Sequence, residues 1–179
     1  MNTSKTVFAG LFVAVGVLLP IAFHMIGVSG RIFLPMHIPV FMAGLLLGPV
    51  YGLIVGIVVP VVSGLTTGMP PLFPIMPMMA AELAVYGAVA GFINKNLGRG
   101  VLLALLGAMV CGRLICIIAL MIFGEMLQIN TDPFTYVFAG VSGGLPGIIL
   151  QIVFIPFIVN RLKQAFFYHK FFNEEVQDG

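Results

Sequence analysis

Two ionisable residues, Glu82 and Arg113, lie inside long apolar stretches of this sequence. A charged side chain within a membrane span is costly, so it is retained mainly where it pairs, relays protons or binds a ligand. Counted from the predicted outer ends of their helices at 1.5 Å per residue, Glu82 lies about 10 Å deep and Arg113 about 15 Å deep. The two side chains could therefore meet. They could form an ion pair that only joins two helices, or they could bind a ligand.

Further polar residues are predicted at the same end of the molecule. Tyr86 follows Glu82 by one helical turn and shares its face, and Gln151 falls in the outer half of the last helix. An apolar cavity with a few converging polar groups is typical of a site for a small molecule. The sequence therefore predicts a substrate-binding set that consists of Arg31, His37, Thr67, Glu82, Tyr86, Arg113 and Gln151.

The alternative chemistry is that of an intramembrane enzyme. A hydrolase needs a nucleophile beside a base, and the arrangement available is Ser63 or Ser142 with His37. Neither serine lies in a recognisable nucleophile motif. The histidines are scattered, and Cys111 and Cys116 lack the spacing of metal ligands, which makes a metal site implausible. We expect no enzyme activity, no metal and no cofactor.

The composition indicates an integral membrane protein of one domain, residues 1–179. Hydrophobic residues make up 60% and charged residues 8%, whereas about 25% is charged in soluble domains. The net charge of +2 is too small to suggest a nucleic-acid partner. Near the N-terminus an apolar run follows Lys5 without a cleavage-type site, so it is interpreted as an uncleaved first helix.

The apolar pattern predicts an all-α fold with six transmembrane helices, at about 6–25, 35–48, 50–65, 75–93, 101–123 and 135–162. The second helix is short, since Ile38 to Gly48 is eleven residues and a straight span needs about 20. It must therefore be supported by protein rather than by lipid. Gly48-Pro49 ends it, and such interrupted segments point to binding sites in transporters. The last stretch is interrupted by Ser142-Gly-Gly-Leu-Pro146.

The placement of basic residues predicts the orientation in the cell membrane. Positive residues are enriched on the cytoplasmic side. With both termini inside, Arg31 is the basic residue left outside, in an outer loop that would form a lid with loops 66–74 and 125–133. The basic residues that this topology places inside are Lys5, Lys95, Arg99, Arg161, Lys163 and Lys170.

Small residues four positions apart give two helices a face for close contact. Gly10 and Ala14 form such a face on the first helix, and Gly52 and Gly56 on the third. Helices approach closely where side chains are small. From spacing alone, the first face could pack within the chain or against a partner.

Several motifs together resemble a known family. They are Leu34-Pro-Met-His-Ile-Pro39, Ala43-Gly-Leu-Leu-Leu-Gly-Pro49, Tyr51-Gly52, Gly56 and Glu82-Leu-Ala-Val-Tyr86-Gly87. The chain, from roughly Thr6 to Lys163, is similar to the substrate-binding S component of an energy-coupling-factor (ECF) vitamin transporter. The resemblance implies a six-helix protein that captures a micronutrient outside and works with a transmembrane coupling protein and two ATPases. It also implies that Gly10 and Ala14 dock on the coupling protein, although the family commonly has an alanine pair there.

The substrate is predicted from the arginines and from the resemblance. Arginine binds carboxylates through paired charge-assisted hydrogen bonds, and tryptophan is absent, which disfavours a large flat heterocycle such as flavin. The pattern from Leu34 to Pro49 is similar to pantothenate-type S components, so pantothenate is the expected vitamin. Pyridoxine-type, thiamine-precursor and folate-like ligands are alternatives. The alternative function is that of a self-contained small-solute transporter or channel.

Overall fold

The computed structural model describes residues 3–25, 30–126 and 132–164, and it leaves out the side chains of His24 and Arg31. Throughout these ranges the regular structure is helical and contains no strand, which confirms the all-α prediction. The elements are α1 (Thr3–Met25), α2 (Gly30–Phe33), α3 (His37–Leu47), α4 (Pro49–Thr67), α5 (Ile75–Gly91), the π-helix η1 (Phe92–Asn96), α6 (Val101–Phe123), α7 (Pro133–Gly143) and α8 (Leu145–Gln164). Lys170 lies outside the described residues.

The predicted boundaries agree with the structure except at two places. The segment before α3 was expected to be a loop, but it contains the short helix α2. The predicted helix 135–162 is wrong as a single element, because the chain forms α7 and α8 with Gly144 between them. Two glycines weaken the helix here, and Pro146 has no N–H to continue the hydrogen-bond ladder of α7.

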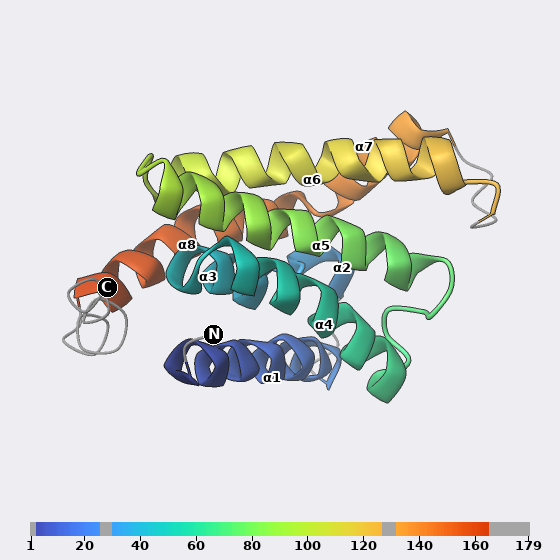
Figure 1. Cartoon of the computed structure of the whole chain (residues 1–179). Helices are drawn as coiled ribbons and strands as arrows, with labels where there is room; N and C mark the ends of the chain where they lie inside the picture. Colours follow the sequence, from blue (N-terminus) through green and yellow to red (C-terminus); the bar gives the residue numbers. More distant parts are fainter. Residues whose placement is uncertain (1–2, 26–29, 127–131, 165–179) are drawn as a thin grey trace.

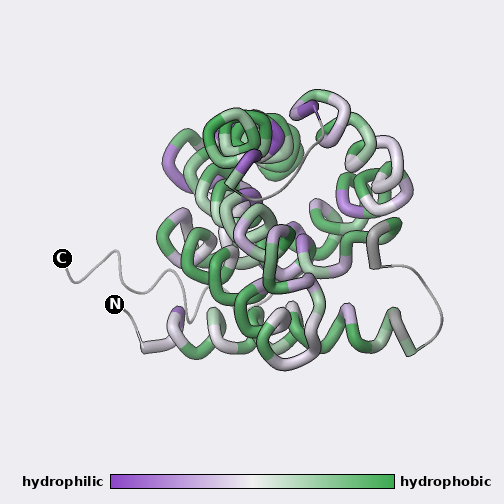
Figure 2. The backbone as a smooth tube through the Cα atoms, turned by 90° about the vertical axis from the view of Figure 1, so that its right-hand side faces the viewer, coloured by the Kyte–Doolittle hydropathy of each residue, from purple (hydrophilic) through white to green (hydrophobic). Residues whose placement is uncertain are grey.

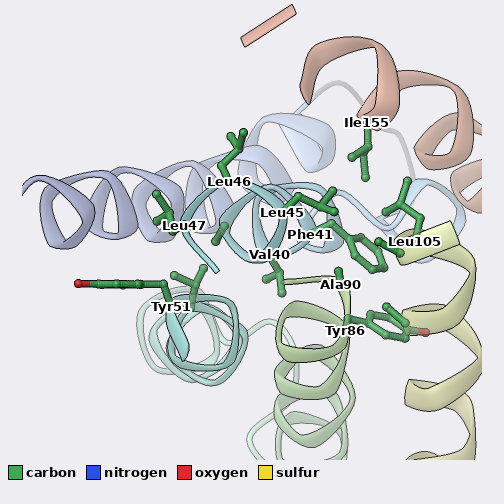
Figure 3. Close-up of a cluster of buried hydrophobic side chains, with 14 of the residues drawn as sticks. Val40, Phe41, Leu45, Leu46, Leu47, Tyr51, Tyr86, Ala90, Leu105 and Ile155 are labelled. Atoms are coloured by element: carbon green, nitrogen blue, oxygen red, sulfur yellow. The ribbon is translucent and has the colours of Figure 1, made fainter. Parts of the chain in front are cut away.

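Helix α3 lies inside the protein, as predicted for a short apolar helix. Nine of its eleven residues are buried, and Figure 3 shows its side chains packed among those of neighbouring helices. Its last turn is also supported: the side-chain amide of Asn94 donates to the carbonyl of Leu45 at 2.8 Å. Gly48 then turns the chain into α4 with a φ of 109°, a left-handed value that favours glycine.

Glycines bring the backbones of α3, α4 and α5 into direct contact. A Cβ on Gly44 or Gly52 would collide with the carbonyl of Gly87, and one on Gly56 would collide with the backbone of Leu83. The predicted small face of Gly52 and Gly56 therefore packs against α5. This three-helix contact fixes the position of α5, which carries Glu82 and Tyr86.

Five helices are long and apolar enough to cross a membrane among the described residues: α1, α4, α5 with η1, α6 and α8. Large apolar side chains such as Val7, Leu103 and Val153 are 57–67% exposed on the outside of the bundle, and Figure 2 shows hydrophobic residues along the helices. The start of α1 and the end of α8 lie at one end of the bundle, and the α4–α5 connection lies at the other (Figure 1). The six-span count and the orientation stay predictions.

Candidate substrate-binding site

A cavity of about 290 Å³ lies between α6, α7, α8 and the first turn of α3. Four polar side chains contribute to its wall, and the other lining side chains are apolar. The polar ones are His37, Tyr86, Arg113 and Gln151, and the apolar ones are Leu34, Met109, Val110, Leu114, Val141 and Ile148. This composition, mostly apolar with a few directing groups, suits a small organic ligand.

The buried carboxylate of Glu82 lies behind this wall and joins α5 to α6. Nη1 of Arg113 lies 2.9 Å from its Oε1, and the hydroxyl of Tyr86 donates to the same oxygen. The thiol of Cys116 donates to Oε2 at 3.5 Å. Glu82 and Arg113 therefore do meet, as their depths in the helices allowed, and the carboxylate of Glu82 contacts one cation and two hydrogen-bond donors.

The ring of Tyr86 is held on several sides. It stacks on Phe41 with the ring centroids 5.0 Å apart and the planes 19° apart, and the His37 ring lies 5.4 Å away at a tilt of 50°. On the α6 side Gly112 leaves the space that the ring occupies, because a Cβ there would collide with it. The hydroxyl is consequently directed at Glu82 by the packing of the ring.

The turn before α3 forms the next part of the wall. Leu34 has a φ of 49°, a left-handed conformation that is uncommon for a non-glycine residue. Its carbonyl accepts from the backbone N–H of His37 at 3.1 Å and from the side-chain amide of Gln151 at 3.4 Å. Nδ1 of His37 is buried and has no hydrogen-bond partner in the described part of the chain.

The predicted site residues fall into three groups. His37, Tyr86, Arg113 and Gln151 line the cavity, and Glu82 contacts two of them. Thr67 is not among the residues that line the cavity. It lies at the end of α4, where its hydroxyl donates to the Ser63 carbonyl at 2.7 Å. The side chain of Arg31 lies outside what the structure describes. Whether these residues bind a substrate stays a prediction.

Sequence reasoning missed the apolar lining and the contact of Cys116. Met109 and Val110 precede Arg113 by four and three residues and so share its helix face, which means that these two could have been found from Arg113. Leu114 directly follows Arg113, so the spacing does not point to it. Cys116 was interpreted as a packing residue, yet its thiol contacts Glu82. Val141 and Ile148 gave no signal, because the position of α7 and α8 depends on tertiary packing.

The serines of the enzyme alternative bond to backbone carbonyls. Ser63 donates to Met69 at 2.6 Å and Ser142 to Ala139 at 3.1 Å. No hydrogen bond joins either serine to His37 within residues 3–25, 30–126 and 132–164. Over the same ranges, no group of His, Cys, Asp and Glu side chains could hold a metal ion.

The predicted docking face on α1 lies on the surface. Gly10 and Ala14 are exposed, and a Cβ on Gly10 would meet no atom within 4 Å. The neighbouring side chains of Val7, Leu11 and Leu18 are 55–67% exposed. The inward side of α1 packs instead through Gly16, which lies against Val59 and Pro39.

The fold and the cavity define a multi-pass membrane protein with an internal site of small-molecule size. A model of the family described as ECF transporter, substrate-specific component, matches residues 4–159, and the chain belongs to this family. Comparison with curated proteins found no significant match, and comparison with solved structures found none either. The members of this family are transporter subunits rather than enzymes. They bind a small substrate and work with a module that consists of a transmembrane protein and ATPases.

Proposed function

We propose that this chain captures a small vitamin with a carboxylate group at the outer face of the cell membrane and delivers it to an ECF module for ATP-driven uptake. The observation that supports a carboxylate is the position of Arg113 in the cavity wall. One of its nitrogens contacts Glu82, and its side chain is 20% exposed. A guanidinium has five N–H donors, so further donors can bind a ligand carboxylate while the ion pair persists.

Pantothenate is the vitamin that we propose to test first. Its carboxylate would pair with Arg113, and its hydroxyls and amide would bond with His37, Tyr86 and Gln151. These three side chains line the same cavity, and Nδ1 of His37 has no partner within the described residues. The support for this particular vitamin is the sequence pattern from Leu34 to Pro49 together with these hydrogen-bonding groups.

The decisive experiment separates a ligand-binding arginine from a purely structural one. Arg113→Gln alone leaves Glu82 buried and unpaired, so the matched variant is the double substitution Glu82→Gln with Arg113→Gln, which removes both charges. Binding of a vitamin panel that includes pantothenate is measured by native mass spectrometry and thermal shift. We expect the double variant to stay folded and to bind about 10- to 100-fold more weakly, the range of a charge-assisted hydrogen bond.

Arg99→Gln is the control for loss of one positive charge, because Arg99 is exposed in the α5–α6 connection. It should bind like the unsubstituted chain. Unchanged binding in the folded double variant would show that the ion pair only joins α5 and α6. The carboxylate proposal would then be wrong.

A further inference from the structure

The cavity has an opening on the outer side of α6. Val110 and Leu114 line the cavity, yet their side chains are 61% and 53% exposed. A residue that both lines a cavity and is more than half exposed lies at its rim. The helix side that carries these two residues also carries Leu106 and Ile118, which are 42% and 48% exposed.

This opening lies halfway along a membrane span. Helix α6 runs from Val101 to Phe123 and is one of the five helices able to cross a membrane. Val110 and Leu114 are each nine residues from the nearer end of α6, which is about 14 Å at 1.5 Å per residue. The hydrocarbon core of a bilayer is about 30 Å thick. The opening therefore faces acyl chains rather than water.

The chemistry of the wall matches this position. Arg113 lies on α6 between Val110 and Leu114, and the other three polar residues of the wall, His37, Tyr86 and Gln151, are buried. Besides the two rim residues, the apolar part of the wall is made of Leu34, Met109, Val141 and Ile148. A ligand that is polar throughout would leave hydrogen-bonding groups unpaired against these side chains, which is unfavourable.

We propose that the substrate is an amphipathic monocarboxylate, whose carboxylate pairs with Arg113 and whose hydrocarbon part lies against Val110 and Leu114 at the membrane-facing opening. This rests on the proposed function of the cavity as a carboxylate site and narrows its substrate class. Expressed against the concentration of the acid in water, each methylene that moves from water to the rim should strengthen binding by about fourfold. Pantothenate, which carries two hydroxyls and an amide, should bind more weakly than a monocarboxylate of similar size with a hydrocarbon body.

The absence of tryptophan from the chain allows a direct test. Leu114→Trp introduces one fluorophore at the rim, and Ile57→Trp is the matched control, since Ile57 lies near the middle of α4, is 42% exposed and does not line the cavity. Each variant is placed in lipid nanodiscs and titrated with ω-bromo-octanoate, whose bromine quenches tryptophan on contact. We expect saturable quenching of Leu114→Trp and only the gradual quenching of bilayer partition for Ile57→Trp.

The saturable phase should disappear when Glu82→Gln and Arg113→Gln are added to Leu114→Trp. Equal, non-saturating quenching at both positions would overturn the proposal, because the acid would then only dissolve in the bilayer. A second measurement uses the unsubstituted chain with butanoate, hexanoate and octanoate, where affinity should rise with each methylene. If carboxylates bind in an Arg113-dependent way without any effect of chain length, the carboxylate site stands and the amphipathic class is wrong. If neither octanoate nor pantothenate binds, the proposed function itself fails.

Discussion

The hydroxyl of Tyr86 donates to Oε1 of Glu82, and that same oxygen lies 2.9 Å from Nη1 of Arg113. One carboxylate oxygen thus connects a neighbour on its own helix with a cation on the next helix. Because Glu82 is only 7% exposed, water cannot replace a lost donor easily. Substitutions around this carboxylate should therefore act on stability as well as on binding.

Glu82→Gln should destabilise the protein by about 3–5 kcal/mol, because it leaves the Arg113 guanidinium partly buried without its anionic partner. The free energy of unfolding is measured by denaturant titration in detergent. The double variant with Arg113→Gln should recover part of the loss. A single variant as stable as the unsubstituted chain would show that Arg113 is adequately solvated without Glu82.

Tyr86→Phe should lower stability by about 1–3 kcal/mol, since the ring can keep its stacking on Phe41 while the carboxylate loses one donor. Cys116→Ala is the comparison, because it removes a thiol, a weaker donor, from the other oxygen of Glu82 at 3.5 Å. Its effect should be smaller. The opposite order of the two effects in thermal unfolding would contradict this account of Glu82.

Gly87→Ala should destabilise the protein by about 1–3 kcal/mol or more, because its Cβ would collide with the backbone of Gly52 and a backbone cannot turn aside as a side chain can. Gly10→Ala introduces the same methyl group where no atom lies within 4 Å, so it should be neutral. Thermal melting of both purified variants in one detergent makes the comparison. Similar melting temperatures would mean that α4 and α5 separate without penalty.

Replacing both Gly10 and Ala14 by leucine should stop uptake by cells that also express the coupling protein and the ATPases, and it should leave ligand binding by the isolated chain unchanged. A close helix contact needs small side chains, and both residues are exposed here. Ala139→Leu, at an exposed position of α7, is the control and should support uptake. Uptake by the chain without any ECF module would instead favour a self-contained transporter.

The sequence was informative where a charged residue or an unusually short helix is unfavourable in a membrane. Glu82 and Arg113 were singled out because each is unfavourable in lipid alone, and their similar depths allowed them to meet. α3 was expected inside the protein because it is too short to cross a bilayer. It was harder to predict which face of each helix lines the cavity. α6 is apolar on almost every side, so its periodicity does not mark the face of Val110 and Leu114 that lines the cavity. The cavity wall on α7 and α8 depends on how the chain packs after Gly144.

The glycine contact of α3, α4 and α5 divides the bundle into a stiff part and a more adjustable part. At Gly44, Gly52 and Gly87 the three backbones are in direct contact, which leaves no side chain between them that could adjust. By contrast, α7 has a single buried residue, Val137. His37 and Tyr86 belong to the stiff part, and Val141 of α7 belongs to the adjustable one. A ligand in the cavity therefore lies between a wall fixed by backbone contacts and a helix, α7, that has little of its surface packed into the protein.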